Sequence, residues 1–141
     1  MPPVMQLTRQ RIGPILVVDD QPLHCRLLER ILEIEGYQAL IANSIAEAEE
    51  IVAEELPALV VLDVRLTDGD GLALARRLKS DPRTADCAVL ACSAGIASGE
   101  RRRALAAGCE DYIGKPIDIS RFVRIVGSLA TPEGARPRAF L

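Results

Sequence analysis

Three aspartates stand where two short apolar runs end. Asp19 and Asp20 follow the run 15–18, and Asp63 follows the run 59–62. Carboxylates that lie close together repel one another, and their pKa values rise unless a cation shares the site. Oxygen ligands of this kind suit Mg²⁺. The pattern therefore predicts a divalent metal site, provided that the fold brings the three side chains together.

A hydroxyl and an ammonium group occupy similar places after two further apolar segments. Ser93 follows the run 88–92, and Lys115 comes shortly after 111–113. Only two of the 17 basic residues are lysines, so a lysine here indicates that a compact ammonium is needed. A carboxylate beside Mg²⁺, a lysine and a hydroxyl meet the needs of phosphoryl transfer, which depends on positioning and charge neutralisation. Asp63 would be the nucleophile and would become an aspartyl phosphate.

The apolar runs are typical of strands, and the segments between them have the spacing of helices. Apolar residues recur there at intervals of three and four, and turn or capping residues separate the elements. Ser44-Ile-Ala-Glu47, for example, has the form of a capping box that starts a helix running to about Glu55. The five strands are expected at 15–18, 39–42, 59–62, 88–92 and 111–113, and a helix follows each of them.

The first helix, which begins at Pro22 and is closed by Gly36, is expected to bury one apolar face. The glycine-rich loop after Asp63 holds two more aspartates. We interpret Asp68 and Asp70 as serving this turn and the cap of the third helix, and not the metal. The apolar face of the first helix consists of Leu23, Leu27, Leu28, Ile31 and Ile34.

Strands that are continuously apolar predict a sheet that is covered on both faces. Helices between the strands make that sheet parallel, so the predicted fold class is α/β, with a doubly wound five-stranded sheet and helices on both faces. Ligands of such folds bind outside the carboxyl ends of the strands, where the five candidate site residues lie. Residues 14–130 form the one predicted domain, between flexible ends at 1–13 and 131–141 that lack periodicity.

The composition excludes several classes of protein. With 141 residues, 49% of them hydrophobic and 26% charged, the chain has the make-up of one soluble globular domain. The net charge is −3, and the end segments hold four arginines, so the folded part is more acidic still and direct nucleic-acid binding is not expected. No apolar run reaches membrane-spanning length and no signal peptide is present, which predicts a cytoplasmic protein without membrane insertion.

The cysteines and the single histidine do not form a metal-binding pattern. The cysteines lack the C-x-x-C spacing of zinc sites, and one histidine adds too few ligands. The cysteines are interpreted as reduced, buried thiols. His24 is interpreted as a surface residue. The cysteines are Cys25, Cys87, Cys92 and Cys109.

Taken together, these residues resemble the receiver domain of two-component response regulators. The resemblance covers residues 14–130, and its strength lies in the full set of motifs, in order and on the expected elements. The matching residues are Asp19-Asp20, Asp63, Gly71 eight residues later, Ser93-Ala94 and Lys115-Pro116. For the fold, the resemblance implies the flavodoxin-like strand order 2-1-3-4-5.

For the chemistry, the resemblance implies a Mg²⁺-dependent phosphorylation of Asp63. The phosphoryl group comes from a phosphohistidine on a histidine kinase or a histidine phosphotransfer protein, and Lys115 and Ser93 assist. The chain is not expected to be an enzyme beyond its own phosphorylation and dephosphorylation. The implied metal ligands are Asp19, Asp20, Asp63 and the backbone carbonyl of Arg65.

The resemblance also implies a switch. Ser93 moves to hydrogen-bond the phosphoryl group and Tyr112 turns inward, which changes the binding of a downstream protein. The chain departs from the family in one respect, because Thr67 stands where a proline is usual, and the loop is expected to be more mobile. Arg65, two residues past Asp63, is expected to change the lifetime of the phosphoryl group, in a direction that the sequence leaves open.

Two other functions stay open. A Mg²⁺-dependent phosphohydrolase would also use Asp63 as its nucleophile, but it would need a substrate pocket and usually a general acid at the position of Arg65. A phosphorylation-independent interaction domain would not need the acidic pair, Asp63, Ser93 and Lys115 together. The favoured interpretation is a single-domain response regulator, since only 11 residues follow the last expected helix.

Overall fold

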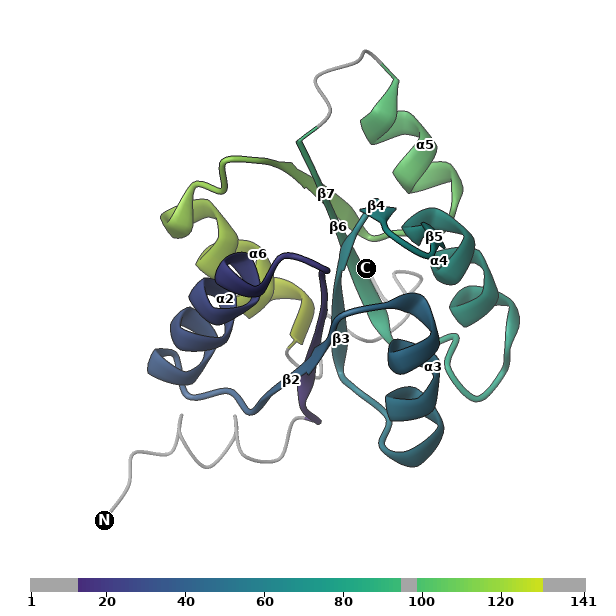
Figure 1. Cartoon of the computed structure of the whole chain (residues 1–141), viewed down its shortest axis with the longest axis horizontal. Coiled ribbons are helices and arrows are strands. Elements are labelled where there is room, and N and C mark those ends of the chain that lie inside the picture. The colour runs from purple at the N-terminus through teal and green to yellow at the C-terminus, as the bar shows by residue number, and fades with distance from the viewer. Residues whose placement is uncertain (1–12, 95–98, 131–141) are drawn as a thin grey trace.

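The computed structural model describes residues 13–94 and 99–130, which contain one five-stranded parallel sheet (Figure 1). Counted along the chain, the strands of this sheet lie in the order 2-1-3-4-5, which confirms the expected order. From one edge to the other they are β2 (Ala39–Ala42), β1 (Ile15–Val18), β3 (Leu59–Asp63), β6 (Ala88–Ser93) and β7 (Asp111–Gly114). A separate small hairpin, which the sequence did not predict, follows β3 and consists of β4 (Arg65–Leu66) and β5 (Gly69–Asp70).

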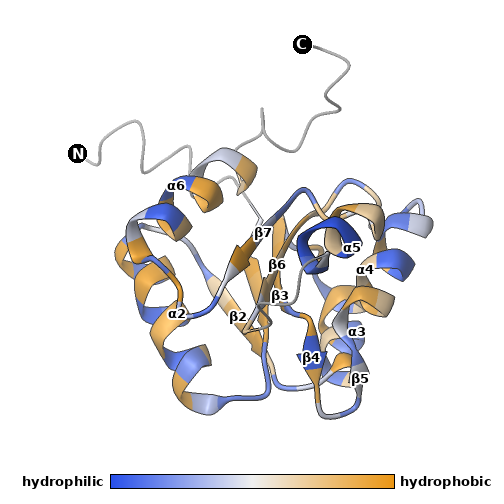
Figure 2. Cartoon of the chain, turned by 90° about the horizontal axis from the view of Figure 1, so that it is seen from above, coloured by the Kyte–Doolittle hydropathy of each residue, from blue (hydrophilic) through white to orange (hydrophobic). Residues whose placement is uncertain are grey.

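Helices cover both faces of the sheet, as Figures 1 and 2 show from two directions. One face carries α2 (Pro22–Ile34) and α6 (Ile119–Ala130). The other face carries α3 (Ile45–Glu54), α4 (Gly71–Ser80) and α5 (Glu100–Ala106). This arrangement confirms the doubly wound α/β fold, and it places the carboxyl ends of all five strands along one edge.

The side chains of the central strands alternate between two hydrophobic cores. On β1, Ile15 and Val17 belong to the core under α2 and α6, whereas Leu16 and Val18 belong to the core under α3, α4 and α5. All four side chains are completely buried. A strand that is buried on both faces needs apolar residues at every position, which is why these strands are continuous apolar runs in the sequence.

Helix α2 buries a face that only partly matches the predicted one. Its buried residues are Cys25, Leu28 and Leu32, which follow one another at helical spacing. Among the predicted core residues, Leu28 is buried and Ile31 packs against the core. The prediction is wrong for the other three residues, because leucine and isoleucine are also common on exposed helix surfaces and do not mark the core by themselves. These three are Leu23, Leu27 and Ile34, with exposed fractions of 83%, 45% and 71%.

The predicted capping box at the start of α3 is confirmed in its main contact. The hydroxyl of Ser44 accepts a hydrogen bond from the backbone N–H of Glu47 at 3.1 Å. The carboxylate of Glu47 accepts from the backbone N–H of Asn43 at 3.2 Å, one residue earlier than a capping box requires. The helix therefore begins where the sequence placed it.

All four cysteines are buried, free thiols, as predicted. Burial raises the pKa of Cys25 to about 11, and the negative charge of Asp19 adds to this effect. Within the described segments, none of the helices combines the length and the apolar character that a membrane span needs. The predicted flexible ends, 1–13 and 131–141, lie outside the described residues except for Gly13.

Candidate metal and phosphoacceptor site

The three aspartates predicted to bind a metal come together at the carboxyl edge of the sheet. Strands β1 and β3 are parallel neighbours, with Val18 opposite Leu62, so the residues that follow them lie side by side. One carboxylate oxygen from each of Asp19, Asp20 and Asp63 lies within 4.8 Å of the others. Asp19 and Asp63 are buried, with exposed fractions of 2% and 7%, whereas Asp20 is partly exposed.

Lys115 joins two of these carboxylates. Its Nζ lies 3.0 Å from Oδ2 of Asp63 and 3.3 Å from Oδ2 of Asp19. The residue follows β7, and its backbone N–H donates to the carbonyl of Ser93 at 2.8 Å, which fixes the start of the side chain. Burial alone lowers the pKa of Lys115, but the hydrogen bond and charge of Asp63 and the charge of Asp19 outweigh it and raise the pKa. The lysine is therefore charged at neutral pH.

Asp19 is the most heavily contacted carboxylate of the site. Its Oδ1 accepts from the backbone N–H of Gln21 at 2.9 Å, and its Oδ2 contacts Nδ1 of His24 as well as Lys115. Burial would raise the pKa of Asp19, but the hydrogen bonds from His24 and Gln21 and the charge of Lys115 lower it overall. The carboxylate is thus held ionised and oriented.

The interpretation of His24 as a surface residue is wrong. Its side chain is only 15% exposed and is turned toward Asp19, as the contact between Nδ1 and Oδ2 shows. His24 lies five residues after Asp19, in the first turn of α2. A residue in that turn can reach back to the strand end that precedes the helix, and this spacing was the signal available in the sequence.

Backbone groups of the loop after β3 hold the other two carboxylates. The N–H of Arg65 donates to Oδ1 of Asp63 at 3.1 Å, and the N–H of Thr67 donates to Oδ2 of Asp20 at 2.9 Å. A proline at position 67 could not make the second bond, because proline has no N–H. The departure from the family pattern thus adds a contact between this loop and the acidic cluster. The role of the Arg65 carbonyl as a ligand stays a prediction.

Ser93 lies on β6, the strand next to Asp63, and Tyr112 lies on β7, the following strand of the sheet. Strand β6 pairs with β3 so that Asp63 stands opposite Cys92, and Ser93 follows directly with an exposed fraction of 1%. Burial and the negative charge of Glu100 raise the pKa of Tyr112, and a hydrogen bond with the side chain of Ser93 opposes them. The two residues expected to form the switch are therefore in contact.

Gly71 is required by a close approach of two backbone segments. A Cβ atom at this position would lie 2.1 Å from the carbonyl oxygen of Asp63, and its N–H donates to the carbonyl of Val64 at 2.8 Å. Helix α4 therefore starts directly against the end of β3. No side chain larger than hydrogen fits there unless the backbone moves.

The two aspartates of the glycine-rich loop bind helix starts, as the sequence indicated for one of them. Asp70 caps α4 through a bond from the backbone N–H of Leu72 at 2.9 Å. Asp68 accepts from the N–H groups of Ile45 and Ala46 at the start of α3, at 3.0 and 3.3 Å, which was not predicted. Neither belongs to the acidic cluster formed by the described residues.

The donor set fits a hard divalent cation. Three carboxylates approach one another closely and Lys115 is the one cation bonded to two of them in the described part of the chain, so negative charge remains to be balanced. Carboxylate oxygens without thiolate ligands favour Mg²⁺ over softer metals. Phosphoryl groups are transferred at such sites by positioning and charge neutralisation.

Comparison with known proteins identifies relatives of this chain. A family model described as the response regulator receiver domain matches residues 15–127. The polar-differentiation response regulator DivK of Brucella ovis is 32% identical over 114 residues, which cover 81% of this chain and 93% of that protein. A putative response regulator from Chloroflexus aurantiacus has a TM-score of 0.81 at 28% identity, covering 85% of this chain and 98% of that one. A sensor protein from Polaromonas has a TM-score of 0.77 at 32% identity, covering 84% and 95%.

These matches span nearly all of the folded part and nearly all of each relative. The similarity to solved receiver structures agrees with the observed fold and strand order. The chain belongs to the response regulator receiver domain family of two-component signalling.

Proposed function

We propose that Asp63 is the phosphoacceptor of this chain and that its phosphorylation requires Mg²⁺. The observation that carries the proposal is the contact of Asp63 with Lys115 inside a cluster of three carboxylates. A carboxylate oxygen of Asp63 attacks the phosphorus of a phosphohistidine. The new O–P bond forms as the N–P bond breaks, and the leaving imidazole nitrogen keeps the electron pair and then binds a proton.

Each residue of the site has a role in this step. Lys115 contacts Asp63 and balances the negative charge that builds up on the transferred group. Ser93 would hydrogen-bond a phosphoryl oxygen on Asp63, a role supported by its position at the end of β6, directly after the residue opposite Asp63. The residues proposed to hold Mg²⁺ are Asp19, Asp20, Asp63 and the backbone carbonyl of Arg65. The ion supplies further charge neutralisation to the phosphoryl oxygens.

The proposed output is a change in protein binding. Phosphorylation adds negative charge beside Ser93, whose hydrogen bond with Tyr112 would be exchanged for one with the phosphoryl group. Tyr112 would then turn inward and alter a surface read by a downstream protein. We propose residues 14–130 as the folded receiver unit of a cytoplasmic protein that binds no nucleic acid directly. Its own chemistry would be limited to self-phosphorylation and autodephosphorylation.

Incubation with acetyl phosphate and Mg²⁺ tests the assignment of Asp63. Intact mass is expected to show a gain of one phosphoryl group in the wild type and none in Asp63→Asn, because an amide cannot accept the group. Omitting Mg²⁺ is expected to abolish the gain in the wild type. Asp86→Asn, an exposed aspartate away from the site, is the matched control and should be phosphorylated like the wild type. Equal phosphorylation of Asp63→Asn and the wild type would contradict the proposal.

Exposed apolar side chains beside the site support a protein as the phosphodonor. Leu23 and Leu27 lie near the start of α2, which follows Asp19 and Asp20, and Ile119 begins α6 soon after Lys115. Their exposed fractions are 83%, 45% and 49%. Both helices cover the same face of the sheet (Figure 1). Such residues around a charged site provide a docking surface for a histidine kinase or a histidine phosphotransfer protein.

Replacing Leu27 by glutamate should slow phosphotransfer from a phosphohistidine protein by about tenfold, which corresponds to the loss of one apolar contact at an interface. The rate with acetyl phosphate should not change, because that donor needs no docking surface. Ile34→Glu, at the far end of the same helix and 71% exposed, is the control and should leave both rates unchanged. The phosphohistidine proteins of the source organism are first compared on the wild type, and the fastest donor is chosen. The measurement is the initial rate of phosphotransfer from that donor to each variant. An equal loss in both variants would exclude this docking surface.

A further inference from the structure

Glu100 is a buried carboxylate that the proposed phosphotransfer does not use. It is the first residue of α5 and has an exposed fraction of 4%. Within the described segments, its Oε1 has no hydrogen-bond partner, and its Oε2 lies 3.9 Å from a terminal nitrogen of Arg65. Burying a carboxylate with one oxygen unsatisfied costs free energy, so a role for this residue has to be sought. The nearby guanidinium of Arg65 is the place to look for it.

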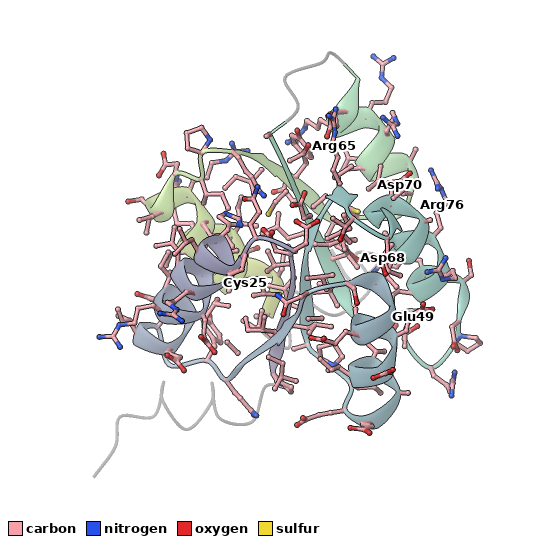
Figure 3. All side chains as sticks on the ribbon, in the orientation of Figure 1. Cys25, Glu49, Arg65, Asp68, Asp70 and Arg76 are labelled. Carbon is pink, nitrogen blue, oxygen red and sulfur yellow. The ribbon has the colours of Figure 1, made fainter. Side chains whose placement is uncertain are left out.

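Arg65 contacts both Asp63, through its backbone, and Glu100, through its guanidinium. Its backbone N–H donates to Oδ1 of Asp63, which fixes the start of the side chain beside that carboxylate. Its guanidinium is directed toward Glu100, and Figure 3 shows Arg65 on the side of the site where α5 begins. The side chain of Arg65 is 75% exposed. Arg65 and Glu100 line one surface cavity of about 300 Å³, together with Asp70 and Arg103.

We propose that Glu100 is a positioning residue for phosphoryl transfer, because it holds the Arg65 guanidinium away from the incoming phosphoryl group. The inference rests on the proposed function of Asp63. A small phosphodonor such as acetyl phosphate brings two negative charges next to Arg65, and these compete with the single charge of Glu100. The guanidinium of Arg65 therefore pairs with the donor only to the extent that it leaves Glu100.

As a consequence, Glu100 weakens the binding of anionic phosphodonors in the wild-type chain. If Glu100 loses its charge, Arg65 is free to pair with the donor, because a guanidinium binds phosphate oxygens in a fixed, forked geometry. The effect belongs to the binding of the donor and not to the chemical step. It should depend on the charge of the donor, and it should vanish when Arg65 is absent.

Phosphorylation rates measured against acetyl phosphate concentration at saturating Mg²⁺ test the inference. Glu100→Gln is expected to raise the second-order rate constant at least threefold, through a lower half-saturating concentration and not a higher maximal rate. Phosphoramidate carries one negative charge fewer at neutral pH and should show a smaller gain. Glu100→Asp keeps the charge and should stay close to the wild type, which controls for a purely structural effect.

The double variant separates this mechanism from simple repulsion. In the Arg65→Asn background, Glu100→Gln is expected to change the rate constant by less than about 1.5-fold. A gain that persists without Arg65 would overturn the inference, because removal of a repelling charge would then explain it. An unchanged rate constant in Glu100→Gln would also overturn it, while phosphorylation of the wild type would leave the function of Asp63 intact. A wild-type chain that gains no phosphoryl group would contradict both.

Discussion

Replacing Lys115 by methionine should raise the affinity for Mg²⁺ about tenfold and slow phosphorylation of Asp63 by about 100-fold. The two effects have opposite signs because the ammonium contacts Asp63 at 3.0 Å and Asp19 at 3.3 Å. Without Mg²⁺, the ammonium of Lys115 pairs with two carboxylates that a divalent cation would otherwise bind. The lysine and the ion therefore compete. A tenfold change is about 1.4 kcal/mol, between the values for two charges about 4 Å apart in water and near a protein surface.

The loss in rate follows from the same contacts. A charged donor beside the acceptor oxygen stabilises the charge that develops on the transferred group, and removal of one such donor costs about 100-fold or more. Mg²⁺ affinity is measured by calorimetry and the rate by intact mass with acetyl phosphate. Lys115→Arg keeps the charge and should retain near wild-type Mg²⁺ affinity. Weaker Mg²⁺ binding in Lys115→Met would contradict the view that the lysine competes with the ion.

Replacing Gly71 by alanine should lower the free energy of unfolding by about 2 kcal/mol, within the range of roughly 1–3 kcal/mol that is typical of overpacking. The added Cβ would lie 2.1 Å from the carbonyl oxygen of Asp63, a distance at which one of the two backbone segments must move. The hydrogen bond from Gly71 to Val64 holds them together. Because the displaced segment carries Asp63, phosphorylation should slow as well.

Gly127→Ala is the matched control for this substitution. Gly127 lies inside α6, and a Cβ there would meet nothing within 4 Å. Alanine in an open helix position should stabilise the protein by about 0.5–1 kcal/mol, because glycine loses more backbone entropy on folding. Urea unfolding measures both variants. Equal stability of the two variants would show that the contact between Gly71 and Asp63 is not as tight as the structure has it.

The strands could be predicted closely, because complete burial leaves a simple pattern in the sequence. The apolar run 15–18 coincides with β1, whose four residues are all buried. The run 39–42 also coincides with β2, although three of the four residues of this edge strand are only partly buried. The packed face of α2 could not be predicted in the same way. Leu23 and Ile34 are apolar but exposed, and only the sheet beneath the helix selects Cys25, Leu28 and Leu32 for the core.

The position of the acidic cluster could also be predicted, since parallel strands bring Asp19, Asp20 and Asp63 to one edge whatever the loops do. The contacts that surround the cluster could not. His24 reaches Asp19 from the first turn of a helix, and Glu100 reaches Arg65 from another helix. Such contacts depend on how loops and helices pack, which apolar periodicity does not encode.

The chemical location of the phosphoryl group tests the central claim most directly. Borohydride reduces an aspartyl phosphate to homoserine, so the reduced wild-type chain can be digested and each aspartate read by mass. After incubation with acetyl phosphate and Mg²⁺, we expect homoserine at position 63 and unchanged aspartate at positions 19 and 20. Homoserine at position 19 or 20, or at no position despite Mg²⁺ binding, would contradict the assignment of Asp63 as the phosphoacceptor.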